Sequence, residues 1–301
     1  MQPALVPLAD FARTLGQKPE RPLWALPDSV PPLPIDHGSV RIRIEDVVDT
    51  VVALQRAEWL QDGVYAGPRG AKDVYRDVLA AARRLEVPVP PAILTSGVMK
   101  AQQAAGTDSR PFLELSSFFF RTAEPGERRF IIGRLIGHVA AQQVTATSLY
   151  GLLVDHAGVR QVARRAVGPV LEVVLAPMGL GIRLALSRWH RAAQLTADRA
   201  GLLCCRSVED AGRAMLRISL STSPQLDPEV YLDQLRDTAD GDSPGRWAEL
   251  LASEPWMHKR MRHLQWFAES ALYAELTNRP TAGKIHRDEL ERRSRDLLGV
   301  S

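Results

Sequence analysis

The sequence predicts an α+β fold in which helices predominate around one small sheet. From about Thr122 onward, apolar residues recur at spacings of three and four almost throughout, which is the periodicity of helices. Before that point only 92–97 and 111–117 have the pattern of short strands, so we expect a sheet of two to four strands around 92–117. Apolar residues make up 45% and charged residues 24% of the 301 positions, which excludes a disordered chain and a polytopic membrane protein.

The N-terminal third predicts a proline-rich arm followed by two helices. Residues 1–38 hold eight of the 21 prolines, so we expect an extended arm that lies on the surface or on the domain. Apolar residues at mixed spacings of three and four predict a helix over 44–60, which a glycine-rich stretch ends. A second helix is expected at about 72–85, before three prolines precede the first strand.

The remainder of the chain predicts successive helices. Pro125 falls in the first turn of the first of these helices, a position that tolerates proline. Further helices are expected at roughly 147–166, 169–186, 187–204, 207–219, 227–239, 244–252, 255–277 and 287–298.

Charge and cysteine content narrow the functional classes. The net charge is only +3, so we expect no nucleic-acid partner. The two cysteines are adjacent, and the first residues lack the basic and apolar regions of a signal peptide, so we expect a cytoplasmic protein with reduced thiols. The longest apolar stretch, 167–186, is interrupted by Glu172 and Arg183, so we expect no transmembrane span there, although peripheral membrane contact stays open.

Three segments carry a pattern related to zinc chemistry. In the first, Arg134 and His138 are four residues apart and share one helical face, the spacing at which H-E-x-x-H peptidases place two zinc ligands around a general base. The second is QLTADRAGLL at 194–203, and the third is SEPWMHKRMRHL at 253–264.

In this order, the three segments resemble the HtpX-like zinc endopeptidases, gluzincins that include the CAAX prenyl protease type. The resemblance implies a gluzincin-like metallopeptidase domain with one small sheet and many helices. On this basis we divide the chain into the arm at 1–38, a degenerate metallopeptidase-like domain at 39–278 and a charged C-terminal helix or tail at 279–301.

The same resemblance shows where the sequence departs from the family pattern. The first zinc histidine is Arg134, the general base is Leu135, and the second zinc histidine is kept as His138. The third ligand, a glutamate in the family, is Gln194, and the aspartate four residues later is kept. The positions of the degenerate site are therefore Arg134, Leu135, His138, Gln194, Asp198, Glu254 and Arg260.

These replacements predict the loss of zinc and of catalysis. An arginine side chain is only a hydrogen-bond donor and cannot ligate a cation. A leucine cannot accept a proton, and the loss of a general base costs a factor of roughly 10²–10⁴ in rate. We therefore expect no cofactor, and a pseudopeptidase with a scaffolding or polypeptide-binding role, in which an edge strand at 112–117 pairs with an extended partner.

Two alternatives stay open: a zinc endopeptidase with a rebuilt site, and a peripheral membrane module that uses 167–186. Within the first alternative, Cys204 and Cys205 are candidates to join His138 in a new metal site, at a reach of roughly 15 Å from Gln194.

The sequence also predicts what fills the place of the metal. We expect the Arg134 guanidinium to lie within roughly 4 Å of an Asp198 carboxylate oxygen, because a buried carboxylate needs a partner. Gln194 and His138 can each accept a further N–H from the arginine. The other histidines, His190, His258 and His263, are expected on the surface or at helix ends.

Overall fold

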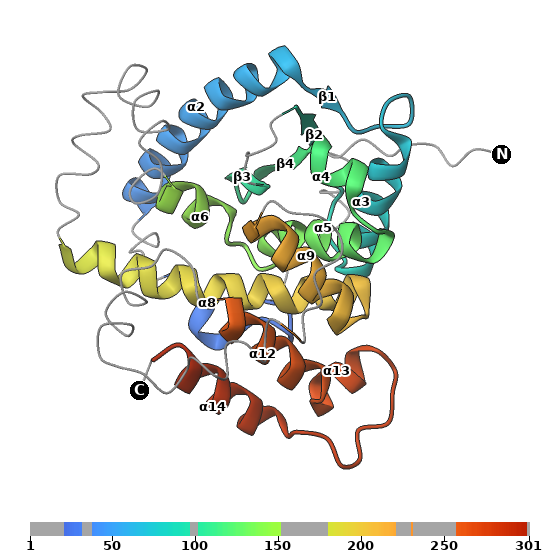
Figure 1. Cartoon of the computed structure of the whole chain (residues 1–301). Coiled ribbons are helices and arrows are strands. Elements are labelled where there is room, and N and C mark those ends of the chain that lie inside the picture. The colour runs from blue at the N-terminus through green and yellow to red at the C-terminus, as the bar shows by residue number, and fades with distance from the viewer. Residues whose placement is uncertain are drawn as a thin grey trace.

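The computed structural model describes residues 21–31, 38–96, 102–151, 180–220, 230 and 257–299. Most of these residues are helical, and the strands form one four-stranded sheet. The predicted α+β fold with predominant helices is therefore confirmed. Figure 1 shows the sheet beside α2 (Gly38–Asp62), with the long helix α8 (Leu180–Cys205) crossing below it.

The sheet contains two strands that the sequence did not predict. Its order is β1 (Val64–Tyr65), β2 (Ala92–Thr95), β4 (Arg110–Ser116) and β3 (Gln103–Thr107). β2 and β4 run parallel, with Ala92 opposite Leu113, whereas both outer strands are antiparallel to their neighbours.

The expectation that 112–117 lies at a free edge of the sheet is wrong. These residues belong mainly to β4, which pairs with β2 on one side and β3 on the other. A turn at Asp108 and Ser109 folds the preceding segment back onto β4 and covers that edge. The outer strand β3 is itself capped, since Ser148 Oγ accepts from Gly106 N (3.1 Å) and donates to Gly106 O (3.0 Å).

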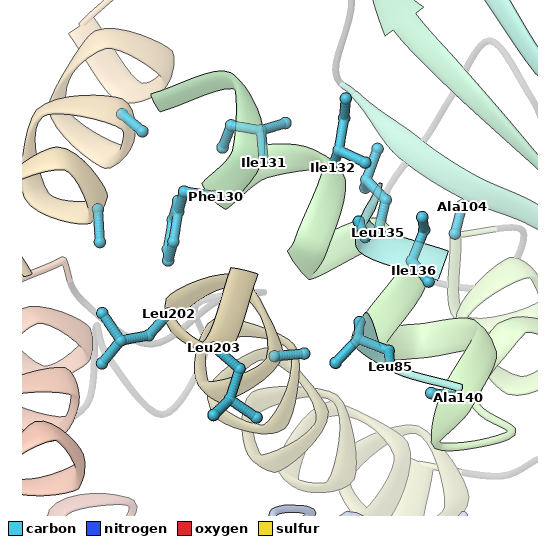
Figure 2. Packing of buried hydrophobic residues seen from close by; sticks show 14 of the residues in the cluster. Leu85, Ala104, Phe130, Ile131, Ile132, Leu135, Ile136, Ala140, Leu202 and Leu203 are labelled. Atoms are coloured by element: carbon cyan, nitrogen blue, oxygen red, sulfur yellow. The ribbon is translucent and has the colours of Figure 1, made fainter. Parts of the chain in front are cut away.

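Alternate residues of β4 face opposite sides of the sheet, as the pleat requires. Phe112 packs edge-to-face on Trp59 of α2, with ring centroids 5.3 Å apart. Leu113 and Leu115 instead join the main apolar cluster of the helical layer. Figure 2 shows part of this cluster, including Phe130, Ile132 and Leu135 of α5 (Pro125–Ala140) and Leu202 and Leu203 of α8.

Several helices fall near their predicted places, but α8 runs unbroken across the boundary expected between helices at 169–186 and 187–204. The remaining elements are α3 (Lys72–Arg84), α4 (Ser117–Thr122), α6 (Val144–Tyr150), α9 (Val208–Leu220), α12 (Met257–Ala268), α13 (Ala271–Leu276), α14 (Arg287–Leu297) and the 3₁₀ turn η1 (Pro27–Ser29). The expected helix over 255–277 is instead divided into α12 and α13. Ser270 causes this division, because its hydroxyl accepts from Tyr273 N (3.1 Å) and begins a new helix. The helices expected at 227–239 and 244–252 lie almost wholly outside the described residues, and those expected at 147–166 and 169–186 lie mostly outside them.

Small residues bring α5 and α8 close together. A Cβ atom on Gly137 would lie 2.5 Å from Ala200 Cβ, and one on Gly201 would lie 2.7 Å from Phe130 Cδ2. Neither glycine therefore has room for a side chain. Because the two backbones approach so closely, polar side chains on α5 can reach those on α8.

We expect Gly137→Ala to lower the free energy of unfolding by about 1–3 kcal/mol, because the added methyl group overpacks the α5–α8 contact. Helix propensity alone predicts the opposite sign, since alanine is favoured over glycine by about 1 kcal/mol. Urea denaturation measures the change. The control is Gly67→Ala, at a position where a Cβ atom would meet nothing within 4 Å. A stabilised Gly137→Ala variant would contradict the close packing.

None of the helices in the described part of the chain is both long enough and apolar enough to cross a bilayer. Of the candidate interfacial stretch 167–186, only residues from 180 onward are described, and they begin α8.

Candidate functional site

Asp198 is the centre of a buried ionic cluster that joins three helices. Its carboxylate, on α8, is fully buried. Arg260 of α12 donates to it twice, from Nε to Oδ2 and from Nη2 to Oδ1, both at 2.8 Å. Arg134 Nε of α5 lies 2.6 Å from Asp198 Oδ1. The predicted contact between Arg134 and Asp198 is therefore present, and Arg260 shares the same carboxylate.

Two opposing effects act on the ionisation of Asp198. Burial by itself would raise the pKa of the carboxyl group, but Arg260 and then Arg134 hold that pKa below its ordinary value. The carboxylate thus stays ionised around neutral pH. A bidentate arginine–carboxylate pair of this kind is stronger than a single hydrogen bond and fixes the angle between its helices.

A second chain of contacts runs from Arg134 along α8. Arg134 Nη2 donates to Gln194 Oε1 (2.5 Å), as the sequence predicted, and Gln194 Nε2 donates to His190 Nε2 (3.0 Å). The His190 ring stacks on Tyr150 of α6, with centroids 4.0 Å apart. His190 is buried rather than exposed, so the expectation of a surface residue is wrong.

The other positions of the degenerate site are placed as follows. His138 is buried, and its Nδ1 donates to Gln143 Oε1 (2.9 Å), whereas the sequence predicted a contact with Arg134. Leu135 lies in the apolar cluster between the helices and the sheet. Glu254 lies outside the described residues. The structure thus brings Arg134, Gln194, Asp198 and Arg260 together.

The donor set at these positions does not fit a zinc ion. Zinc in a catalytic site takes three ligands from histidine, cysteine, aspartate or glutamate. Here a guanidinium group contacts both Gln194 and Asp198, and it repels a cation. Among the described residues, no three His, Cys, Asp or Glu side chains are grouped so that they could hold a metal ion.

The two cysteines are poor candidates for a replacement site. Burial raises the pKa of the Cys204 thiol to about 12 and that of the Cys205 thiol to about 12. Within the part of the chain that the structure describes, neither thiol is grouped with two further His, Cys, Asp or Glu side chains that could complete a metal site. Cys204 instead packs against Gly133, where a Cβ atom would lie 2.8 Å from its own Cβ.

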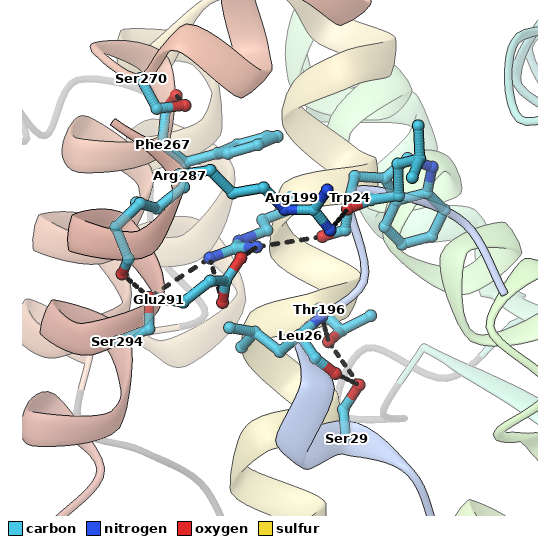
Figure 3. A network of polar contacts seen from close by, with 12 residues as sticks. Trp24, Leu26, Ser29, Thr196, Arg199, Phe267, Ser270, Arg287, Glu291 and Ser294 are labelled. Atoms are coloured by element: carbon cyan, nitrogen blue, oxygen red, sulfur yellow. Dashed lines mark hydrogen bonds and ion pairs between the residues drawn. The ribbon is translucent and has the colours of Figure 1, made fainter. Parts of the chain in front are cut away.

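A second buried network surrounds Arg199, the neighbour of Asp198 (Figure 3). The Arg199 guanidinium is fully buried and donates to Glu291 Oε1 (2.9 Å) and Ser294 Oγ (3.2 Å) of α14. Its Nε donates to His263 Nε2 (3.0 Å), and its Nη1 donates to Trp24 O (3.2 Å). Arg199 therefore ties α8 to α12, to α14 and to the N-terminal segment.

His263 is wholly buried in this network, so the expectation of a surface position is wrong. Its Nε2 accepts from Arg199 and its Nδ1 lies 3.3 Å from Ser294 Oγ, which fits the neutral ring. Burial and the neighbouring Arg199 lower the pKa of His263 well below its ordinary value, although Asp198 acts in the opposite direction. The sequence offered no signal for this role, because a histidine on a helix has no distinctive spacing.

We expect stability to fall with pH below about 6.5 because of His263. Below that pH, His263 is protonated in the unfolded chain but stays neutral in the folded chain. This one group therefore lowers the free energy of unfolding by about 1.4 kcal/mol for each unit by which the pH falls. The fall continues until the pH reaches the lowered pKa of the folded state.

Urea denaturation between pH 7 and pH 5 measures this slope. In His263→Gln, unfolding should take up about one proton fewer, so the free energy of unfolding should depend less steeply on pH. The amide oxygen of the glutamine can still accept from Arg199. The control is His286→Gln, at an exposed position. An unchanged slope in His263→Gln would contradict the neutral buried ring.

Two helices cross at small residues beside a small mixed sheet, and Arg134 and Gln194 of the predicted degenerate site face each other across this crossing. This arrangement is consistent with a metallopeptidase-type domain. The chain belongs to Peptidase family M48, whose sequence profile matches residues 68–268. No curated protein and no solved structure gives a significant match to the chain. The match includes α5, α8 and α12, which carry the ionic cluster, and excludes α2, α14 and the N-terminal segment.

Proposed function

We propose that this M48 domain is a pseudopeptidase that binds or scaffolds a polypeptide without cleaving it. The observation that carries this proposal is the Arg134 guanidinium in contact with both Gln194 and Asp198. A fixed cation at this place satisfies the buried carboxylate electrostatically, but it has no exchangeable water to activate.

The neighbouring position supports the same proposal. Leu135 stands where the family has its general base, and it is 4% exposed within the apolar cluster. It has no group that accepts a proton. A carboxylate at this position would be desolvated among apolar side chains, so the packing around it favours the leucine.

Metal analysis and a cleavage assay test the proposal on the purified chain. We expect no stoichiometric zinc after dialysis against a zinc-containing buffer, and no cleavage of fluorescein-labelled casein above the rate of a heat-denatured sample. One zinc per chain that is lost in His138→Ala, together with cleavage that a chelator stops, would favour a rebuilt zinc endopeptidase instead.

Restoring two ligands should restore the metal. We expect the variant Arg134→His with Gln194→Glu to bind about one zinc per chain, because two histidines four residues apart and a glutamate on the facing helix then form a three-ligand set. Isothermal titration with zinc chloride measures the stoichiometry. The control adds His138→Ala to the same variant and should abolish binding. If the restored variant folds and still binds no zinc, the positions are not those of a former metal site.

A further inference from the structure

The N-terminal segment 21–31 is held on α8 mainly through its backbone. Leu26 N donates to Thr196 Oγ1 (3.1 Å), and Trp189 Nε1 donates to Ser29 O (2.9 Å). Arg199 adds the bond to Trp24 O. The hydroxyls of Thr196 and Ser29 are also joined, at 2.8 Å. All of these contacts are made by side chains of α8, and all except the one between the two hydroxyls are directed at main-chain atoms of the segment.

The segment inserts some of its side chains into the protein and leaves the others exposed. Trp24, Ala25, Leu26 and Ser29 are almost completely buried, whereas Leu23 and Val30 are 59% and 56% exposed. Trp24 and Ala25 join the main apolar cluster, and Leu26 packs with Ala192 and Leu195 of α8 and with Leu298 after α14 in a small separate cluster. A short segment that inserts buried anchors between exposed positions resembles a peptide bound in a groove.

The segment also organises its own turn. The Arg21 guanidinium donates to Leu26 O, to Pro27 O (3.1 Å) and to Ser29 Oγ (2.5 Å), and Ser29 Oγ donates to Leu26 O (2.8 Å). A ligand that is held in its bound conformation loses less entropy on binding. The turn η1 therefore has the properties of a preorganised ligand.

The segment reaches the degenerate site through one side chain. Gln143 Nε2 donates to Ser29 O (3.1 Å), while Gln143 Oε1 accepts from His138 Nδ1 (2.9 Å). The carbonyl of Ser29 thus receives two donors, from Gln143 and from Trp189. Whatever occupies this place orients Gln143 and, through it, His138.

We propose that residues 21–31 are a ligand built into the chain, and that the α8 surface they cover is a binding site for external polypeptide segments of the pattern W-x-L-x-x-S. The inference rests on the proposed polypeptide-binding function and names where the polypeptide binds. The groups of α8 and Gln143 that contact the segment lie inside the region matched to the M48 family, whereas 21–31 and Leu298 lie outside it. The built-in segment competes with the external partner at an effective concentration of about millimolar.

The test uses the full chain with a sequence-specific protease site inserted after Pro34, so that one cut detaches the arm without removing it. The probe is a fluorescein-labelled peptide of residues 21–31, RPLWALPDSVP. We expect the labelled peptide to bind the cut chain about 100-fold more tightly than the uncut chain, as measured by anisotropy, because the cut ends the intramolecular competition. A peptide with Trp24→Ala and Leu26→Ala should not bind.

Two further measurements keep the proposal falsifiable. Leu26→Ala in the uncut chain weakens the built-in segment and should also allow the labelled peptide to bind, whereas adding Thr196→Val should reduce that binding about tenfold. The proposal is overturned if the cut chain unfolds, or if the folded cut chain binds neither peptide or binds both equally.

These outcomes are independent of those for the pseudopeptidase. If the chain binds zinc and cleaves casein, the proposal that it lacks catalysis is wrong, and the result of the peptide-binding experiment is not affected. If the chain neither binds zinc nor cleaves casein, and the labelled peptide does not replace the built-in segment, only the proposed binding site on α8 is wrong.

Discussion

Replacing Asp198 with asparagine is expected to lower the free energy of unfolding by about 3–5 kcal/mol, because two buried guanidinium groups then lose their shared countercharge. Asp198 is fully buried, and its partners Arg134 and Arg260 come from α5 and α12. Chemical denaturation at pH 7 measures the loss. Asp288→Asn is the matched control, since that side chain is 93% exposed, and it should leave the midpoint unchanged.

The arginines should not be equivalent in this cluster. If Arg134 were the sole countercharge of Asp198, Arg134→Ala would strand the carboxylate at a cost of about 3–5 kcal/mol. The bidentate bond from Arg260 changes that expectation, because Asp198 keeps a countercharge when Arg134 is removed. We therefore expect Arg134→Ala to cost less than Arg260→Ala.

Replacing the whole cluster gives the sharper comparison. The triple variant Arg134→Met, Asp198→Leu and Arg260→Met leaves no buried charge of the three, and it should recover most of the stability lost in Asp198→Asn. If the triple variant is less stable than the single variant, the cluster contributes through packing rather than through charge pairing.

The stabilisation of the folded chain by Asp198 depends on pH. Its pKa is lower in the folded state than in the unfolded chain, so the stabilisation is fully present above a pH of about 4. The stabilisation is lost as the pH falls through the folded value. Acid below pH 4 therefore acts on the same contacts that Asp198→Asn removes.

Arg199→Met is expected to lower the free energy of unfolding by about 3–5 kcal/mol, because a buried carboxylate on the other side of α8 then loses its countercharge. The change removes the partner of Glu291 and the donor to Trp24 O and His263. It also removes the stacking of the guanidinium carbon 5.1 Å from the Phe267 ring centre. Thermal unfolding followed by circular dichroism measures the loss.

Two further variants assign the cause. Arg292→Met on α14 removes an arginine that bonds Glu289 at the surface, and it should not shift the midpoint. Adding Glu291→Leu to Arg199→Met should restore part of the stability, because the unpaired carboxylate is then absent. A double variant that is no better than Arg199→Met would mean that the lost bonds to Trp24 and His263 dominate.

The sequence predicted the ionic cluster in part because helical spacing is a strong constraint. Arg134 and His138 share a face, as do Gln194 and Asp198, so placing α5 against α8 was enough to bring Arg134 to Asp198. Arg260 was recognised as a position of the family pattern, but its partner depends on how α12 crosses α8. That crossing is a property of the packed fold, which no local spacing encodes.

The errors have local causes. β3 was missed because Gln103–Thr107 holds two alanines and a glycine instead of the branched or aromatic residues of typical strands. Without β3, the neighbouring strand seemed to be a free edge. His190 and His263 were assigned to the surface by their polarity, yet each has buried partners on the same or another helix. His190 lies four residues before Gln194, and that spacing could have indicated their contact.

The raised pKa of the Cys204 and Cys205 thiols makes alkylation of the folded chain slow. With a pKa of about 12, only a fraction of roughly 10⁻⁴ of either group is thiolate at pH 8, so alkylating reagents meet an almost unreactive pair. Cys204 packs against Gly133 of α5, so when α8 separates from α5 its thiol returns to an ordinary pKa of about 8.5 and reacts far faster. The alkylation rate of Cys204 therefore measures how often the α5–α8 contact opens, with no label introduced.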